Sequence, residues 1–220
     1  NLKFWTTSPN GGTDNNHSND TFATTKNSAL SGTYTIGGTT PSFASFTAAV
    51  TDLNNRGVCG PVTFNVRNGV YNENLMLYPI TGSSSTNTIT FQSQSGDSTQ
   101  VTLQRQNEPG SGTYLIQFLG ASYVTFKNMT LRSYGSNAYC YLVYYYSYYT
   151  PNYAGSGNNT FKNCIMTHKG SSSYPIYIYP YYATLGTCDN WKFDNNLIIG
   201  NGAAYTMYIY GYMTTPTTGQ

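Results

Sequence analysis

Five short segments share one pattern, and their recurrence decides the fold: VTFNV (62–66), ITFQS (89–93), VTFKN (124–128), NTFKN (159–163) and WKFDN (191–195). Each segment is centred on a phenylalanine, and consecutive segments lie 27 to 35 residues apart. Alternate residues of a strand point to opposite faces, so the phenylalanine shares its face with the residues two before and two after it. A repeat of this length fits one coil of a solenoid and is too long for a single hairpin. The predicted core stack is Phe64, Phe91, Phe126, Phe161 and Phe193.

The last three segments also carry an asparagine two residues after the phenylalanine, at Asn128, Asn163 and Asn195. Identical amides stacked at the strand spacing can hydrogen-bond from one coil to the next. We therefore expect an asparagine ladder at a turn of the solenoid.

A second repeated strand is predicted in the C-terminal half, where YLVYYYS (141–147), YPIYIYP (174–180) and YTMYIYG (205–211) align. Ile176 and Ile178 lie 31 residues before Met207 and Ile209, which places all four in register on the inward face. The outward face then carries columns of tyrosines: Tyr144, Tyr146, Tyr177, Tyr179, Tyr208 and Tyr210.

Like residues recur at like positions along the chain, which favours parallel stacking. The predicted fold is all-β, a right-handed parallel β-helix over residues 31–213, and a β-sandwich is the alternative.

Residues 43–55, FASFTAAVTDLNN, form the one segment with helical spacing of its apolar residues. Ser42 or Ser45 can cap its start, and Gly57 can end it. Terminal repeats of a solenoid need a cover over the open core and the unpaired strand edge. We expect this short helix to cap the first coil.

Residues 1–30 do not follow the repeat, and LKFWTT and DTFATT read as two short strands around an Asn/Gly-rich loop. They resemble the closing hairpin of an immunoglobulin-like module. Two strands alone cannot bury Leu2, Phe4, Trp5 and Phe22. The segment is therefore expected to pack on the β-helix or to complete a sheet in a neighbouring chain. Residues 214–220, TTPTTGQ, read as a linker-like tail, compatible with a longer native chain.

The stretch FASFTAAVTDLNNRGVCGPVTFNVRNGVYNENLML (43–77) resembles the opening of pectin-lyase-like β-helices, and of pectin methylesterases in particular. Those proteins begin with a helix, a strand and a G-x-Y-x-E motif, which stands here as Gly69, Tyr71 and Glu73. Glu73 is interpreted as a structural group at a strand end in preference to an acid catalyst.

Two further segments, GTYTIGG (32–38) and TNTITFQSQSGDSTQVTL (86–103), make the chain similar to large secreted surface proteins of Bacteroidota. The resemblance covers about residues 30–210. It implies the fold and secretion, so we expect an extracellular or cell-surface location.

The catalytic residues of those enzymes are not matched. Pectin methylesterases use two aspartates and an arginine, with a supporting glutamine, on the central strands. Beyond residue 110 the chain has only Asp189 and Asp194 as acidic residues, and Lys162 holds the place of Asp194 in the coil before. No carboxylate pair for glycoside hydrolysis is apparent, and Arg132 and Lys169 lack the acidic calcium cluster that a lyase requires. A non-catalytic protein without a cofactor is expected.

Composition narrows the partners. Charged residues make up 8% of the chain, the net charge is +2 and no basic stripe exists, which argues against nucleic acid. No apolar run reaches the roughly 18 residues of a membrane span. The 23 tyrosines combine apolar rings with polar hydroxyls, which suits a partner's surface or sugar rings.

These features favour a structural subunit that assembles with itself into a fibre or surface layer, through its N-terminal strands and tyrosine columns. The alternatives are a glycan-binding adhesin module and, less favoured, a polysaccharide-active esterase or lyase.

The four cysteines, Cys59, Cys140, Cys164 and Cys188, form no CxxC pair and have no neighbouring histidine, so a zinc site is not expected. They allow two disulfides in any of three connectivities, or free thiols that act as small core residues.

Weaker signals concern calcium and glycosylation. Asp14, Asn16 and Asp20 are spaced loosely like a calcium loop, but without its glycine and closing glutamate a solvated turn is favoured. N-x-S/T triplets and a D-S-T motif similar to the O-glycosylation motif of Bacteroidota mark candidate modification sites: Asn16, Asn19, Asn158 and Ser98. Asn128 also lies in a triplet, but its inward position predicts that it stays unmodified.

Overall fold

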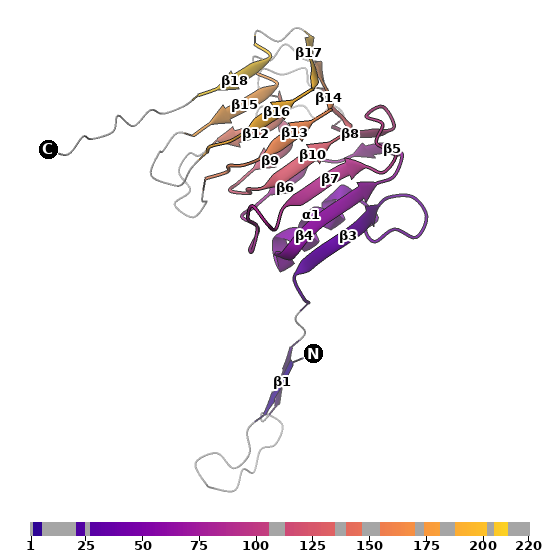
Figure 1. Ribbon diagram of the computed structural model, residues 1–220, viewed down its shortest axis with the longest axis vertical. Coiled ribbons are helices and arrows are strands. Elements are labelled where there is room, and N and C mark those ends of the chain that lie inside the picture. Colours follow the sequence, from indigo (N-terminus) through magenta and orange to yellow (C-terminus); the bar gives the residue numbers. More distant parts are fainter. Residues whose placement is uncertain are drawn as a thin grey trace, which may run out of the picture.

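The computed structural model describes residues 2–5, 21–24, 27–105, 113–134, 140–146, 155–169, 174–180, 188–201 and 205–210. The described chain winds into a parallel β-solenoid, with coils stacked along one axis (Figure 1). Three parallel sheets form its sides, and we name them the Phe sheet, the middle sheet and the Tyr sheet. The predicted parallel β-helix is confirmed.

The Phe sheet contains the repeat from which the fold was predicted. Phe64, Phe91, Phe126, Phe161 and Phe193 pair in register, and neighbouring ring centroids lie 4.6 to 5.5 Å apart in stacked geometry. The first four rings are fully buried. The strands of this sheet are β3 (Leu30–Ile36), β4 (Val58–Val66), β7 (Ile89–Ser93), β10 (Val124–Lys127), β13 (Thr160–Lys162) and β16 (Lys192–Asp194).

The middle sheet follows the Phe sheet in each coil and was not predicted. In β8 four consecutive residues are buried, so no period-2 pattern marks the strand. The inward residues of later strands include polar ones, such as Ser133 and His168, which hide the core face further. Its strands are β5 (Gly69–Asn72), β8 (Val101–Arg105), β11 (Thr130–Tyr134), β14 (Ile165–Lys169) and β17 (Leu197–Asn201).

The Tyr sheet closes each coil. Ile176 pairs with Met207 and Ile178 with Ile209, which confirms the predicted register. The last two strands are shorter than the segments predicted at 174–180 and 205–211. The sheet is made of β6 (Leu75–Leu77), β9 (Thr113–Phe118), β12 (Cys140–Tyr146), β15 (Ile176–Tyr179) and β18 (Met207–Ile209).

Helix α1 (Phe46–Arg56) caps the first coil, as predicted, and packs against β3 and β6. The Ser45 side chain accepts a hydrogen bond from the Ala48 N–H at 3.1 Å, and Gly57 ends the helix at a φ of 66°. The helix begins three residues later than the predicted residue 43, because Phe43 forms a parallel bridge with Ile36. Its buried face is Phe46, Ala49, Val50 and Leu53.

The N-terminal strands β1 (Leu2–Trp5) and β2 (Thr21–Thr24) form an antiparallel sheet of their own, with Phe4 opposite Phe22. This hairpin lies away from the coils, beyond the end where β3 begins the solenoid (Figure 1). The solenoid itself begins at Leu30, one residue before the predicted boundary, because Leu30 is fully buried and its N–H donates to the Gly57 carbonyl at 2.9 Å.

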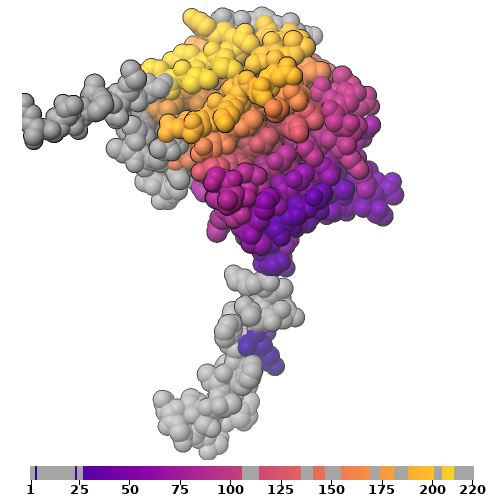
Figure 2. Space-filling model, viewed as in Figure 1, coloured from indigo at the N-terminus to yellow at the C-terminus, as the bar shows by residue number. Residues whose placement is uncertain are grey.

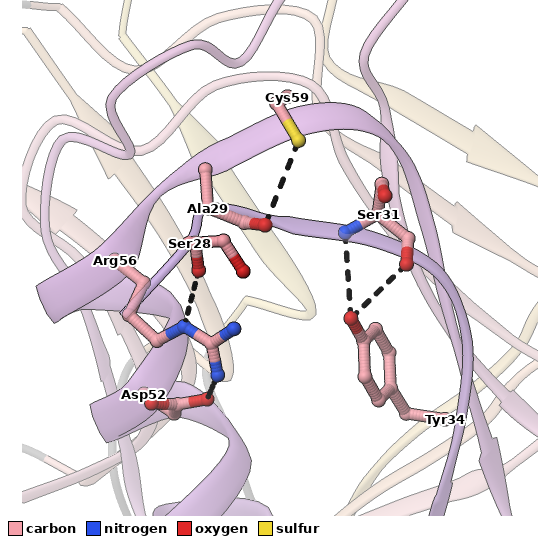
Figure 3. Close-up of polar contacts among 7 residues, drawn as sticks. All are labelled: Ser28, Ala29, Ser31, Tyr34, Asp52, Arg56 and Cys59. Atoms are coloured by element: carbon pink, nitrogen blue, oxygen red, sulfur yellow. Dashed lines mark hydrogen bonds and ion pairs between the residues drawn. The ribbon is translucent and has the colours of Figure 1, made fainter. Parts of the chain in front are cut away.

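The segment between hairpin and solenoid is anchored to α1 and β4 (Figure 3). The Arg56 guanidinium donates to the Ser28 carbonyl at 2.7 Å and pairs with the Asp52 carboxylate at 2.7 Å. The Cys59 thiol approaches the Ala29 carbonyl at 3.5 Å. These contacts hold residues 28–29 against the first coil.

Several predictions lie outside the described residues: the loose calcium spacing at Asp14, Asn16 and Asp20, the triplet at Asn19, and the tail at 214–220. Within the described ranges, no group of three or more His, Cys, Asp or Glu side chains is placed to hold a metal ion. No helix of these ranges has the length and hydropathy needed to cross a membrane.

Candidate functional site

The outward surface of the Tyr sheet is covered by tyrosines from β12, β15 and β18. Tyr144 pairs with Tyr177 and Tyr146 with Tyr179, and Tyr177 pairs in turn with Tyr208. The alternation of these strands turns isoleucine and valine inward, so the rings stand on the opposite face. All six predicted tyrosines therefore lie on one surface.

The rings stack along the solenoid axis, and we call this surface the tyrosine face. Tyr177 lies 5.8 Å from Tyr144 and 5.4 Å from Tyr208, measured between ring centroids, with planes 18° and 11° apart. In the next column Tyr179 lies 5.5 Å from Tyr146 and 4.7 Å from Tyr210. Rings inside the columns have neighbours on both faces and turn their edges outward.

Four tyrosines that were not predicted extend this face: Tyr114, Tyr141, Tyr174 and Tyr205. Tyr174 stacks on Tyr205 at 5.4 Å and 14°, and Tyr141 packs on Tyr144 at 4.6 Å. A signal for the first pair exists in the sequence, because Tyr174 and Tyr205 share the 31-residue spacing of the inward isoleucines. Tyr141 was missed because it falls on an irregularity of β12, where two consecutive backbone N–H groups share the Pro175 carbonyl.

The tyrosine face is electrically neutral over a wide pH range. Burial, and then the neighbouring hydroxyls of Tyr141 and Tyr144, raise the pKa of Tyr177 above its ordinary value. Burial likewise raises the pKa of Tyr144 and of Tyr114. The hydroxyls therefore stay protonated and remain both donors and acceptors of hydrogen bonds at any physiological pH.

The last coil leaves its core side uncovered (Figure 2, yellow). Its strands β16, β17 and β18 are the edge strands of the three sheets. Of the six large hydrophobic residues described as exposed, only Val70 lies outside this coil; the others are Leu197, Ile199, Tyr205, Ile209 and Tyr210. Ile209 faces inward in register with buried Ile178 but is 54% exposed, because no coil follows it.

The asparagine ladder links three coils at the turn after the Phe sheet. Asn163 donates to the Asn128 side-chain oxygen at 3.0 Å, and Asn195 donates to that of Asn163 at 2.9 Å. All three have a φ between 51° and 54°, in the left-handed region that asparagine tolerates better than most residues. The ladder therefore lies at the corner, half-buried to exposed, and not inside the core.

The residues of the G-x-Y-x-E motif stabilise the first coil. The Glu73 carboxylate accepts hydrogen bonds from the Phe46 and Thr47 N–H groups at 3.2 and 2.7 Å, at the N-terminus of α1. A carboxylate is favoured there because it satisfies free N–H groups and the helix dipole. The Tyr71 hydroxyl donates to the Arg67 carbonyl at 2.8 Å.

The carboxylates of the later coils are not brought together as a catalytic pair would be. Asp194 stands beside Lys162 on the outward face of the Phe sheet and forms an ion pair with it at 2.7 Å. Asp189 is exposed in the segment before β16. Arg132 lies over the Tyr134 ring at 5.9 Å, and the side chain of Lys169 lies outside the described part.

A buried polar pair in the middle sheet was missed. The Ser133 hydroxyl and His168 Nδ1 lie 2.8 Å apart, and the two side chains are 4% and 0% exposed. Arg105 precedes Ser133 in the same inward column. His168 Nε2 has no hydrogen-bond partner in this structure. A serine and a histidine 35 residues apart carry no recognisable motif, so only the coil register brings them together.

This pair predicts acid sensitivity. Burial lowers the pKa of His168, so the folded protein resists the proton that the unfolded chain takes up below about pH 6.5. The free energy of unfolding is expected to be constant above that pH and to fall below it, by up to about 1.4 kcal/mol per pH unit, until the folded pKa is reached.

The check is urea unfolding between pH 5 and 8, with His168→Asn as the control that keeps a polar partner for Ser133 but does not titrate. A difference between the two proteins that does not vary with pH contradicts the prediction.

The three cysteines whose state is described, Cys59, Cys164 and Cys188, are free thiols. Burial raises the pKa of Cys164 and of Cys188 to about 11, so both stay protonated and unreactive. For these two the interpretation as small core residues holds, whereas Cys59 is exposed.

Two candidate glycosylation sites lie within the described part. Ser98 is half-exposed in a turn where Asp97 accepts hydrogen bonds from Thr99. Asn158 is half-buried, and its side-chain oxygen accepts from Asn190 at 3.2 Å. Ser98 is thus the more accessible of the two.

Comparison with known proteins adds no relative: no family model, no curated protein and no solved structure matches the chain. The tyrosine face and the last coil are therefore interpreted from their own geometry.

Proposed function

We propose that the chain is a non-catalytic structural protein of the cell exterior that associates with copies of itself through the tyrosine face. The observation that carries this proposal is the stacking of outward tyrosines over three successive coils, at ring separations of 4.7 to 5.8 Å along the two main columns. Tyrosine is enriched and charge is depleted at the centres of protein interfaces.

The stacking also makes the face rigid. A ring held between two others loses little conformational freedom when a partner covers it, so association costs less than at a surface of free side chains. The neutral hydroxyls offer hydrogen bonds without the desolvation cost of a charge. These properties suit a broad, flat contact between copies.

An exterior location is supported by the low charge of 8% and by the resemblance of the chain to secreted surface proteins. The pectin-lyase-like resemblance belongs to the same proposal. The structural contacts of Glu73 and Tyr71 give these two motif residues a role that needs no catalysis.

Glycan binding is favoured less by this geometry. A sugar ring inserted between two aromatic rings needs about 7 to 8 Å between them, twice the contact distance of carbon atoms. Tyr144, Tyr177 and Tyr208 are closer than that. Only rings at the open end, such as Tyr205, which is 58% exposed, have room for a sugar to stack.

The test is sedimentation velocity over a wide concentration range, with electron microscopy of the same samples. We expect concentration-dependent oligomers, and at least a tenfold weaker association for Tyr144→Thr combined with Tyr177→Thr, since threonine keeps the strand preference but removes the rings.

Gln117→Thr is the matched control, because Gln117 pairs with Tyr144 in the same column but has no ring. Dispersed monomers at every concentration would refute self-association. An association constant that the double substitution leaves unchanged would remove the tyrosine face from it.

A further inference from the structure

The open end of the solenoid is built to receive another layer of strands. The phenylalanine stack, the asparagine ladder and the tyrosine columns all end there, at Phe193, Asn195 and Tyr208. Ile209 and Leu197 are more than half exposed in the same coil. Edge strands with exposed apolar side chains readily pair with a further strand.

The opposite end of the solenoid offers no equivalent surface. Helix α1 buries Phe46 and Leu53 over the first coil, and Phe46 packs against Phe91 at 5.9 Å and Tyr71 at 5.2 Å. Two solenoids therefore cannot join by stacking first coil on last coil, because the helix occupies that position.

The hairpin β1–β2 is the other incomplete sheet of the chain. It has two strands of four residues and shares no sheet with the solenoid. Its strands carry Leu2, Phe4, Trp5 and Phe22, and a two-stranded sheet of this size is marginal in water without a partner surface.

The hairpin cannot reach the open end of its own chain. Arg56 holds the Ser28 carbonyl against the first coil, which leaves four Cα–Cα steps to Thr24, or at most about 15 Å. A strand added beyond β16 would lie six strand spacings from β3, about 29 Å away. Only another copy can supply the hairpin.

The charges of the two surfaces are also opposite. Lys3 is the one charged residue of β1 and β2 and is exposed. The described part of the last coil, 188–201 and 205–210, has Asp189 and Asp194 against Lys192, a net charge of −1.

We infer that the open end of the last coil binds the N-terminal hairpin of a second copy of this chain by strand addition. The inference rests on the proposed self-association and adds an axial contact to the contact of the tyrosine face. A hairpin at one end and an acceptor at the other form a heterologous contact, which continues from copy to copy as a filament.

Two variants of the full chain separate donor from acceptor. Lys3→Pro with Ala23→Pro places prolines at paired positions of the hairpin and prevents its strands from pairing. Leu197→Lys with Ile209→Lys puts charges on the open end, as natural edge strands do. Val70→Lys is the matched control, because Val70 is 61% exposed but lies in the first coil. Circular dichroism and a cooperative thermal transition establish that each variant is folded.

Sedimentation velocity is expected to show filaments or long oligomers for the wild type and for Val70→Lys, and loss of the long species for each double variant alone. An equimolar mixture of the two double variants should restore one contact only and form a 1:1 dimer, since one supplies the hairpin and the other the open end. Absence of that dimer overturns the inference.

Failure of the inference is distinguishable from failure of the proposed function. A wild type that assembles, with double variants that assemble equally well, keeps self-association and excludes the hairpin contact. A wild type that stays monomeric at every concentration excludes both.

Discussion

Replacing Phe126 by alanine is expected to lower the free energy of unfolding by about 3 to 5 kcal/mol, the range of large-to-small changes in a closed core. Phe126 is fully buried between Phe91 at 5.1 Å and Phe161 at 5.5 Å, with both ring pairs stacked. Removal of the central ring breaks two aromatic contacts and leaves a cavity that the parallel strands on either side cannot close.

Phe193→Ala is the matched control for this change. Phe193 stacks on one ring only, Phe161 at 5.3 Å, and lies in the last coil, where it is half-buried. Its loss should cost less than half as much, because water reaches the site and one face has no partner. Chemical denaturation monitored by circular dichroism measures both, and equal losses would contradict a stack that is closed in the middle and open at the end.

The second large effect is expected at Asn159. Its side-chain oxygen accepts from the Val124 N–H at 3.0 Å, and its Nδ2 donates to the Ala121 carbonyl at 3.0 Å, with the residue fully buried. Asn159→Ala leaves a buried N–H and a buried carbonyl without partners, at a cost of about 1 to 3 kcal/mol each. We expect a loss of about 2 to 5 kcal/mol in the free energy of unfolding.

Asn196 provides the control, because it makes the same two bonds one coil later. Its oxygen accepts from the Cys164 N–H at 2.8 Å, and its Nδ2 donates to the Phe161 carbonyl at 2.9 Å. Asn196 is only half-buried, so water can replace part of what Asn196→Ala removes. Urea unfolding of both variants should therefore show the larger loss for Asn159→Ala, and the reverse order would refute this account.

The Phe sheet and the tyrosine columns could be predicted because each depends on a local alternation that recurs. A period of two within a strand assigns the face of each residue, and the recurrence after 27 to 35 residues assigns the coil. Helix α1 was predictable for the same reason, since its apolar spacing, Ser45 and Gly57 are all local signals.

The middle sheet was not predictable, because its strands lack that alternation. Thr102 and Thr130 are buried on a face that should be solvated, and Ser133 and His168 are buried on the core face. Burial here depends on segments far away in sequence that cover these positions. The contact between Ser133 and His168 follows from the register of β11 and β14 and from no feature of either residue alone.

The sequence by itself determined the stacking of coils, the identity of the phenylalanine core and the side of the sheet on which Tyr144, Tyr177 and Tyr208 stand. These depend on short-range periodicity, which survives in a linear string. Only the tertiary structure decided that the tyrosine rings stack too closely to admit a sugar, that the helix closes one end, and that Ile209 and Leu197 lie exposed at the other. Those properties depend on what covers each residue, and coverage is a property of the folded chain.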